Sequence, residues 1–312
     1  MIITVAPFPA IEYIYGVEAL AADEEQTARH VSLNILSKGI YSAQMMKVLQ
    51  EEPILISSMG GFAGKYIKHY LDKSKVKADI VWTDYETPQY VKIVDEHFMN
   101  NYTIKTEPTI PGEKESNLMT QKIRAHIKKV STLVLAGAVP ESMQKTVYKE
   151  WMEEAKAHNV KVVVSTGQKD VLEVVMQQKP YALMFTEEQL NQLGLMSIQI
   201  EEIAERMSVY LKQSVHYVCV YLKQRGALVL SKNKYCRVES IFQLVHKDNA
   251  AASGAFLGAL AVGINRKYEQ EKFAKICLAA SLAANDNVNH RICIKKDIDC
   301  RIKKMKVREL ER

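Results

Sequence analysis

The sequence predicts an α/β protein with one mostly parallel sheet flanked by helices. Two observations carry this prediction. Short apolar runs without clean polar alternation recur along the chain, as is typical of strands buried on both faces. Between them lie longer segments with the apolar period of a helix that buries one face. Strands and helices in alternation are typical of a parallel sheet covered by helices on both faces.

The expected strands are Ile2–Val5, Thr132–Ala136, Val160–Val164, Tyr181–Phe185 and Tyr217–Tyr221. The expected helices are Asn117–Lys129, Ser142–His158, Lys169–Gln178 and Ile198–Lys212. In the second helix, apolar side chains recur every four residues and mark one buried stripe. These are Met143, Val147, Trp151 and Ala155.

Two regions depart from this alternation. Glu12–Leu20 and Pro88–Thr106 resemble short strands with polar faces, the second interrupted at Asn100-Asn101. We expect segments 10–22 and 86–106 to pair as a small β-lid over the carboxyl edge of the sheet. Since no internal repeat or low-complexity linker occurs, residues 1–312 are expected to form a single domain that carries this lid.

The composition argues against a membrane protein, a metalloprotein and a nucleic-acid-binding protein. Hydrophobic residues make up 47% and charged residues 25%, which is ordinary for a globular protein. Without a signal pattern or a membrane-length apolar run, a cytoplasmic location is expected. Five cysteines without a CxxC pair, and histidines without metal-binding spacing, favour reduced thiols and no metal site. The basic tail Lys295–Arg312 predicts a solvated final strand or helix, so neither nucleic acid nor a membrane is an expected partner.

The stretch Lys247–Gly263 is the most informative for function. It reads KDNAAASGAFLGALAVG, a polar turn that opens a helix of small and apolar residues. Backbone N–H groups at a helix N-terminus bind anions such as phosphate, so Asn249, Ala250 and Ala251 are expected to form an anion hole. Asp248 is the only carboxylate close by. Asp248 is either a base that accepts a proton from a bound ligand or a cap of the helix N-terminus, and the cap is the favoured interpretation.

Several motifs, in the same order along the chain, resemble those of the ribokinase-like (PfkB) carbohydrate kinases, in the 1-phosphofructokinase and tagatose-6-phosphate kinase branch. The similarity runs from about Ile2 to Asn285. The matches, each with the family pattern, are Phe8-Pro9-Ala10-Ile11-Glu12 (N-P-A-I-D), Leu36-Ser37-Lys38-Gly39-Ile40-Tyr41-Ser42-Ala43 (G-G-K-G-I-N-V-A), Met59-Gly60-Gly61-Phe62-Ala63-Gly64 (L-G-G-x-x-G), Glu86-Thr87-Pro88-Gln89-Tyr90-Val91-Lys92-Ile93 (E-T-R-x-N-V-K-I), Ala136-Gly137-Ala138-Val139-Pro140 (G-S-L-P), Val164-Ser165-Thr166-Gly167 (D-T-S-G), Met184-Phe185-Thr186-Glu187-Glu188 (K-P-N-x-x-E) and Leu222-Lys223-Gln224-Arg225-Gly226-Ala227 (L-G-x-x-G-A). The resemblance implies a ribokinase-like fold, ATP with Mg²⁺ as phosphoryl donor and a phosphorylated ketohexose as acceptor. It also implies a lid that closes over the sugar and often pairs subunits, hence a homodimer through the lid.

The resemblance also implies that the catalytic base is missing. The family's G-A-G-D-S aligns with Asn249-Ala250-Ala251-Ala252-Ser253, so Ala252 occupies the position of the aspartate that takes the proton of the attacking hydroxyl. A positioned base contributes about 10²–10⁴-fold in rate. Turnover is therefore expected to be impaired unless Asp248, Glu12 or a water replaces that base.

On the sugar side, Glu12 stands at the family's sugar-binding aspartate, and Lys38 and Gly39 are retained at the sugar-phosphate loop. Tyr41 replaces an asparagine there. Pro88 replaces an arginine of the lid and so removes a bidentate phosphate donor. We expect weak binding of the usual phosphosugar.

On the nucleotide side, Thr186 stands for the family's asparagine, and Glu187 lies near the acidic residue that holds Mg²⁺ through water. Gly226 is kept in the nucleotide loop, whereas Lys223 replaces its first glycine. Three functions stay open at this point. The chain is an impaired kinase for fructose 1-phosphate, fructose 6-phosphate or tagatose 6-phosphate, a catalytically silent pseudokinase with a ligand-binding or regulatory role, or a kinase for a different, non-phosphorylated small molecule.

Overall fold

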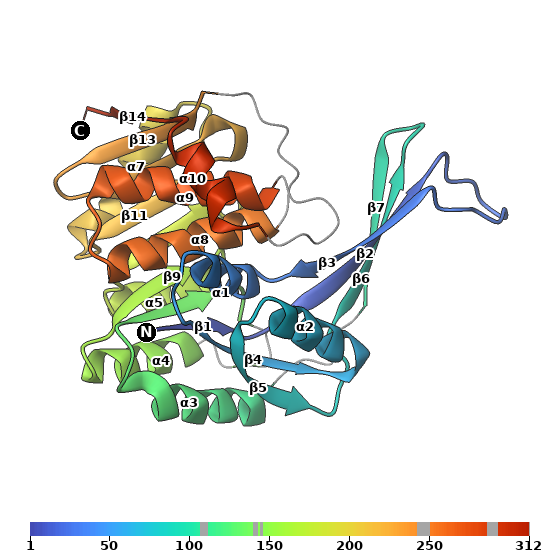
Figure 1. The fold of residues 1–312 in the computed structure, drawn as a ribbon, viewed down its shortest axis with the longest axis horizontal. Helices are drawn as coiled ribbons and strands as arrows, with labels where there is room; N and C mark the ends of the chain where they lie inside the picture. Colours follow the sequence, from blue (N-terminus) through green and yellow to red (C-terminus); the bar gives the residue numbers. More distant parts are fainter. Residues whose placement is uncertain (107–111, 140–142, 144–145, 242–249, 286–292, 312) are drawn as a thin grey trace.

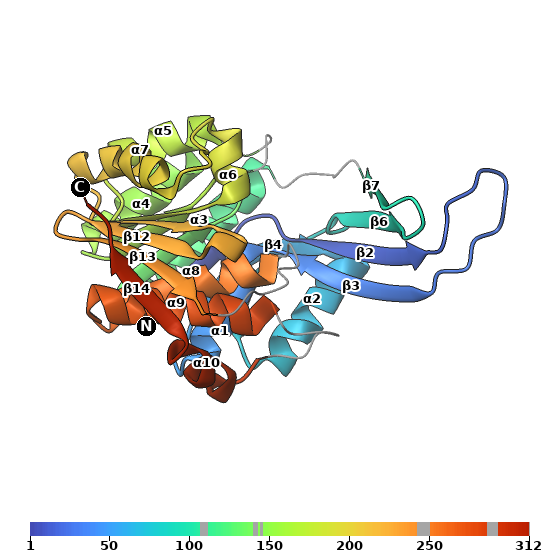
Figure 2. The ribbon, with the colours of Figure 1, turned by 90° about the horizontal axis from the view of Figure 1, so that it is seen from above.

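A ten-stranded sheet forms the centre of the main body, and a smaller sheet projects from one side of it (Figures 1 and 2). The computed structural model describes residues 1–106, 112–139, 143, 146–241, 250–285 and 293–311. The order of the large sheet is β14-β13-β12-β11-β10-β9-β8-β1-β4-β5. Its strands are β1 (Ile2–Ala6), β4 (Ile54–Gly60), β5 (Lys77–Thr83), β8 (Thr132–Ala136), β9 (Lys161–Ser165), β10 (Ala182–Thr186), β11 (Tyr217–Tyr221), β12 (Ala227–Ser231), β13 (Tyr235–Ser240) and β14 (Met305–Glu309). From β11 to β5 neighbouring strands are parallel, and β12, β13 and β14 are antiparallel to their neighbours.

Helices cover both faces of this sheet, as Figure 2 shows. One face carries α1 (Lys38–Val48), α2 (Gly61–Lys73), α8 (Ala250–Asn265), α9 (Gln270–Asn285) and α10 (Lys295–Ile302). The other face carries α3 (Glu113–Ile127), α4 (Val147–Ala157), α5 (Lys169–Gln177), α6 (Glu187–Gln192) and α7 (Ile200–Lys212). In the described residues, no helix is both long enough and apolar enough to cross a membrane.

The second sheet has the order β3-β2-β6-β7. Its strands are β2 (Ala10–Val17), β3 (His30–Leu36), β6 (Gln89–Asp95) and β7 (Asn100–Lys105). Because side chains alternate along a strand, one face collects apolar residues and the other collects polar ones. The apolar face includes the paired Tyr15 and Val31, and the polar face includes the paired Glu12 and Asn34.

The predicted α/β class and mostly parallel sheet are confirmed. All five predicted strands occur, each within one residue of its expected bounds, and the four predicted helices correspond to α3, α4, α5 and α7. Strands β2, β6 and β7 lie inside the two predicted lid segments, whereas β3 lies outside them, and Asn100-Asn101 begin β7 rather than interrupt a strand. That this sheet acts as a lid stays a prediction. The basic tail forms α10 and the edge strand β14, in line with a final helix or strand.

Helices α1 and α8 pack with their backbones in contact, because α8 carries glycine at two positions four residues apart. A Cβ added at Gly254 would lie 2.6 Å from the Cβ of Tyr41 and 2.7 Å from the carbonyl oxygen of Lys38. A Cβ added at Gly258 would overlap the carbonyl oxygen of Ser42. The first turns of the two helices therefore lie side by side.

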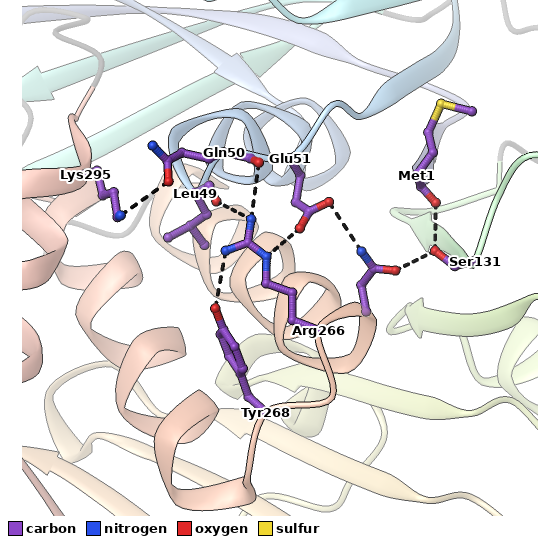
Figure 3. Close-up of polar contacts among 9 residues, drawn as sticks. Met1, Leu49, Gln50, Glu51, Ser131, Arg266, Tyr268 and Lys295 are labelled. Atoms are coloured by element: carbon purple, nitrogen blue, oxygen red, sulfur yellow. Dashed lines mark hydrogen bonds and ion pairs between the residues drawn. The ribbon is translucent and has the colours of Figure 1, made fainter.

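A polar network joins the other ends of these helices (Figure 3). Arg266, just after α8, donates to Glu51 Oε1 at 2.6 Å and to the carbonyl oxygens of Leu49 and Gln50 at 2.8 and 3.2 Å. These carbonyls belong to the end of α1, where helical acceptors lack partners within the helix. The network thus fixes the register of α1 against α8.

Candidate active site

The order of strands places a site at the carboxyl end of β1. Strand β1 pairs with β4 on one side and with β8 on the other, so the direction of strand addition reverses there. In open parallel sheets, ligands bind beyond the carboxyl ends of strands at such a switch point. Gly39 lies over it, since an added Cβ would approach Ala6 Cβ to 2.6 Å and Ala136 Cβ to 3.4 Å. Gly39 therefore allows α1 to start directly on the sheet.

Two helix N-termini meet at this place. The Ser37 hydroxyl caps α1 by accepting the Ile40 N–H at 3.4 Å, and Lys38 is the first residue of the helix. The start of α8 lies beside it, because Gly254, the fifth residue of α8, contacts Lys38 and Tyr41. Neither first turn carries an acidic side chain. The positive ends of two helix dipoles and a lysine together favour an anion.

Ala252, the position predicted for the family's catalytic aspartate, carries a side chain without proton chemistry. Ala252 lies in the first turn of α8 and is 2% exposed. Ala250 and Ala251, two of the three predicted anion-hole residues, are half-buried in the same turn. Asn249 and Asp248 lie outside the described residues. The role of Asp248 as base or cap therefore stays a prediction.

Glu12 lies on the polar face of the small sheet. It is paired in register with Asn34 of β3 and with Tyr90 of β6. Burial raises the pKa of the Glu12 carboxyl above its usual value, against the opposing charge of Lys92. A carboxylate whose ionised form is disfavoured in this way holds a proton more readily than an exposed glutamate.

Tyr41 and Pro88 serve the packing of the protein. The Tyr41 hydroxyl accepts the Ile35 N–H at 3.4 Å, and its ring meets Tyr70 edge-on with centroids 6.2 Å apart. Burial raises the pKa of Tyr41 to about 12. Pro88 is buried, and its carbonyl oxygen accepts the Ile11 N–H at 3.0 Å. Tyr41 of α1 thus ties β3 to the body, whereas Pro88 extends the pairing of β2 with β6.

Glu86 is identified by the sequence only as part of the lid motif, and its contact with α2 is not predicted. Its carboxylate accepts the N–H groups of Phe62 at 2.9 Å and Ala63 at 2.7 Å, and so caps α2. Gly61 has φ +64°, and a Cβ there would overlap the Glu86 carboxylate. The motifs at Gly60-Gly61 and at Glu86-Thr87 were both recognised in the sequence. Their contact could not be predicted, because only the fold brings these two segments together.

On the nucleotide side, Thr186 ends β10 and caps α6. Its hydroxyl accepts the Gln189 N–H at 3.4 Å, and the Gln189 side chain accepts the Thr186 N–H at 3.0 Å. The family's N-x-x-E pattern places its glutamate three residues after the asparagine. That position is Gln189 in this chain, a residue that the sequence reasoning did not single out.

The carboxylates next to it are engaged in ion pairs. Glu187 pairs with Arg225 at 2.9 Å, and Glu188 pairs with Lys223. Burial acts to raise the pKa of Glu188, but its hydrogen bonds, led by the one from Lys223, lower it overall. In phosphoryl-transfer sites Mg²⁺ is held by one or two carboxylates, water and the phosphates of the substrate, so Glu187 and Glu188 would bind it only by exchanging their cationic partners. Within the described residues, no group of three or more His, Cys, Asp and Glu side chains is arranged to hold a metal.

Gly226 closes the loop between β11 and β12. Its φ is +86°, and an added Cβ would overlap the carbonyl oxygen of Val238. Only glycine fits both the conformation and the space. Lys223, at the family's first glycine, keeps a positive φ of +50°.

Comparison with known proteins agrees with this geometry. The model of the pfkB family of carbohydrate kinases matches residues 9–297. The chain is 20% identical to tagatose-6-phosphate kinase of Staphylococcus epidermidis over 88% of this chain and 89% of that one. It is 24% identical to 1-phosphofructokinase of Bacillus subtilis, over 74% and 75% of the two chains.

The fold is shared with solved structures. Phosphofructokinase-2 from Escherichia coli, in complex with substrates and products, superposes with a TM-score of 0.83 at 16% identity, over 97% of this chain and 98% of that chain. A tetrameric inhibited form of the same enzyme gives a TM-score of 0.82 over the same shares, also at 16% identity. The predicted ribokinase-like fold is confirmed, and the chain belongs to the pfkB family of carbohydrate kinases.

Proposed function

We propose that this protein is an impaired phosphohexose kinase, which binds ATP and a sugar phosphate but transfers the phosphoryl group slowly. The observation that carries the proposal is the pair of adjacent first turns of α1 and α8. They bring Lys38 and the N–H groups of Ala250 and Ala251 to one edge of the sheet. Phosphoryl transfer depends mainly on positioning and charge stabilisation, which this arrangement supplies.

Ala252 limits the rate in this proposal. Its methyl group cannot take the proton of an attacking hydroxyl, so the acceptor is activated by water, by Asp248 or by Glu12. Fructose 1-phosphate, fructose 6-phosphate and tagatose 6-phosphate are the candidate acceptors, in keeping with the relatives named above. Because the carboxylates of α6 are paired with cations, Mg²⁺ would be held mainly by the phosphates of ATP, whose charge it would neutralise.

Two other functions compete with this proposal. Loss of the base at Ala252 favours a pseudokinase that binds ligands as a signal. Pro88 favours a smaller, non-phosphorylated acceptor, since proline offers no side-chain donor in place of the arginine that would bind a sugar phosphate.

Calorimetric titration with ATP and Mg²⁺, alone and with each sugar phosphate or its non-phosphorylated sugar, separates these functions when ADP release is followed in parallel. Binding with slow ADP release supports the impaired kinase, and Asp248→Ala then abolishes turnover if Asp248 is the base. Binding without ADP release supports the pseudokinase. ADP release only with non-phosphorylated sugars supports the third function. Absence of ATP binding contradicts both kinase functions, and absence of ATP and sugar binding together contradicts the pseudokinase as well.

We further propose a cytoplasmic homodimer joined through the apolar face of the small sheet. Val31 is 57% and Ile104 60% exposed on this face, next to Tyr15 and Tyr102. Burial of such side chains against a second copy is favourable. Sedimentation should show a dimer that Ile104→Lys converts to a monomer, and a wild-type monomer at micromolar concentration would contradict the proposal.

A further inference from the structure

A row of polar side chains crosses the polar face of the small sheet. Its members come one from each strand and are partners in register: Asn34 (β3), Glu12 (β2), Tyr90 (β6) and Lys105 (β7). Side chains directly opposite one another on neighbouring strands share a face and lie within contact distance. This polar row therefore runs from an amide and a carboxyl group at one end to an ammonium at the other.

The polar row lies at the base of the small sheet, where three strands join the body. Strand β2 follows β1 after a short connection, and β3 leads directly into Ser37, the cap of α1. Just before β6, the Thr87 N–H donates to the Gly60 carbonyl oxygen at 3.1 Å, which holds this segment at the end of β4. The polar row is thus next to the carboxyl ends of β1 and β4, where ligands of such sheets bind.

The inner part of the polar row is sheltered from water. Asn34, Glu12 and Tyr90 are half-buried, whereas Lys105 is exposed. Burial raises the pKa of the Glu12 carboxyl and that of the Tyr90 hydroxyl. Hydrogen bonds from half-buried groups to a ligand meet less competition from water, so this end of the row suits the hydroxyl groups of a sugar.

Lys105 lies close to Pro88, which stands at the position of the family's arginine. By the alternation of a strand, Pro88 lies on the same face as Tyr90. The Thr106 hydroxyl donates to the Gln89 carbonyl oxygen at 3.0 Å and so holds the end of β7 beside this segment. The Lys105 side chain leans over β6, with Nζ 5.7 Å from the centroid of the Tyr90 ring. An ammonium is therefore present on the face from which the guanidinium is missing.

We infer that Lys105 binds the phosphate group of the acceptor, and that the acceptor is accordingly a phosphorylated sugar. The inference rests on the proposed function. Glu12 and Asn34 bind hydroxyl groups at the other end of the polar row. Neighbouring strands lie about 4.8 Å apart, so the backbones of Glu12 and Lys105, two strands apart, are separated by about 10 Å. The flexible stem of the lysine lets its ammonium adjust to a phosphate within this span.

The test is calorimetric titration with fructose 1-phosphate, fructose 6-phosphate and tagatose 6-phosphate, and with fructose and tagatose as probes without phosphate. Lys105→Ala removes the cation, and Lys105→Arg restores it. Lys77→Ala is the matched control, because Lys77 is likewise exposed on an edge strand but lies at the amino end of β5. ATP with Mg²⁺ is titrated separately to report on the nucleotide side.

Lys105→Ala should weaken binding of the sugar phosphates by about tenfold, because a charge-assisted hydrogen bond to phosphate is lost. The affinities for ATP, fructose and tagatose should stay unchanged. Lys105→Arg should recover most of the loss, and Lys77→Ala should change nothing. The difference between the wild type and Lys105→Ala should shrink in about 1 M NaCl, where charges at the surface are screened.

Equal affinity of the wild type and Lys105→Ala for every sugar phosphate that the wild type binds would overturn the inference and leave the proposed function intact. An equal loss of affinity for ATP and for the sugar phosphates would also overturn the inference, since it would show a general effect of charge. Failure of the wild type to bind any of the three sugar phosphates would overturn both the inference and the proposed function.

Discussion

Gly254→Ala tests whether α1 and α8 touch through their backbones. The added Cβ would lie 2.6 Å from Tyr41 Cβ and 2.7 Å from the Lys38 carbonyl oxygen. Carbon atoms pack best at about 3.5–4.0 Å, so the two first turns must separate by about 1 Å. Overpacking of this kind costs about 1–3 kcal/mol, and alanine returns about 1 kcal/mol through its higher helix propensity. The free energy of unfolding should fall by about 1 kcal/mol.

Urea unfolding followed by circular dichroism measures the change. Ala125→Gly is the matched control, because Ala125 is exposed within α3 and reports helix propensity alone, at a cost of about 1 kcal/mol. If Gly254→Ala instead raises the free energy of unfolding by as much as Ala125→Gly lowers it, the close packing of the two helices is refuted. Ligand binding supplies a second readout, since a shift of about 1 Å between Lys38 and α8 should weaken phosphate binding more than it weakens the fold.

Three further predictions concern catalysis, pH and the polar network. Ala252→Asp should raise ADP release with a sugar phosphate by about 10²–10⁴-fold in a coupled assay, and a folded, ATP-binding variant without this gain would show that more than the base is missing. Asp95 accepts two backbone hydrogen bonds, the stronger influence coming from the Phe98 N–H and the next from the Leu20 N–H. These bonds lower the pKa of the Asp95 carboxyl below its usual 3.8. The stability that Asp95 contributes is therefore present above pH 3.8 and is lost as the pH falls through the lower pKa of the folded state. In an acid titration followed by circular dichroism, Asp95→Asn should remove this part of the dependence of stability on pH. An unchanged titration curve would contradict the assignment. Arg266→Ala should lower the free energy of urea unfolding by about 2 kcal/mol, because three bonds to Glu51 and to the end of α1 are lost, and a change below about 0.5 kcal/mol would refute the role of the network.

The central strands were predictable because each is a short apolar run buried on both faces, as in Thr132–Ala136. The polar edge strands were harder. Strand β3 reads HVSLNIL and has an exposed first half, so its local pattern does not distinguish it from a loop. Its place is decided by pairing with β2, a contact between distant segments that periodicity does not report.

For the site, the sequence could name residue types but not their partners. The prediction that a catalytic base is missing at Ala252 follows from the aligned motif alone. That Glu188 is paired with Lys223 could not be deduced, because 35 positions separate them and only the parallel pairing of β10 and β11 brings them together. The burial of Tyr41 was equally hidden, since the same side chain would fit a ligand surface or a core.

The sequence by itself determined the class of fold and the family, because these depend on residue identities and on the order of motifs. The tertiary structure alone decided which charges neutralise one another and which helices touch. Both depend on distances between segments remote in sequence. The glycines at 254 and 258 illustrate the division: the sequence shows the absent side chains, and only the packed α1 shows what their absence permits.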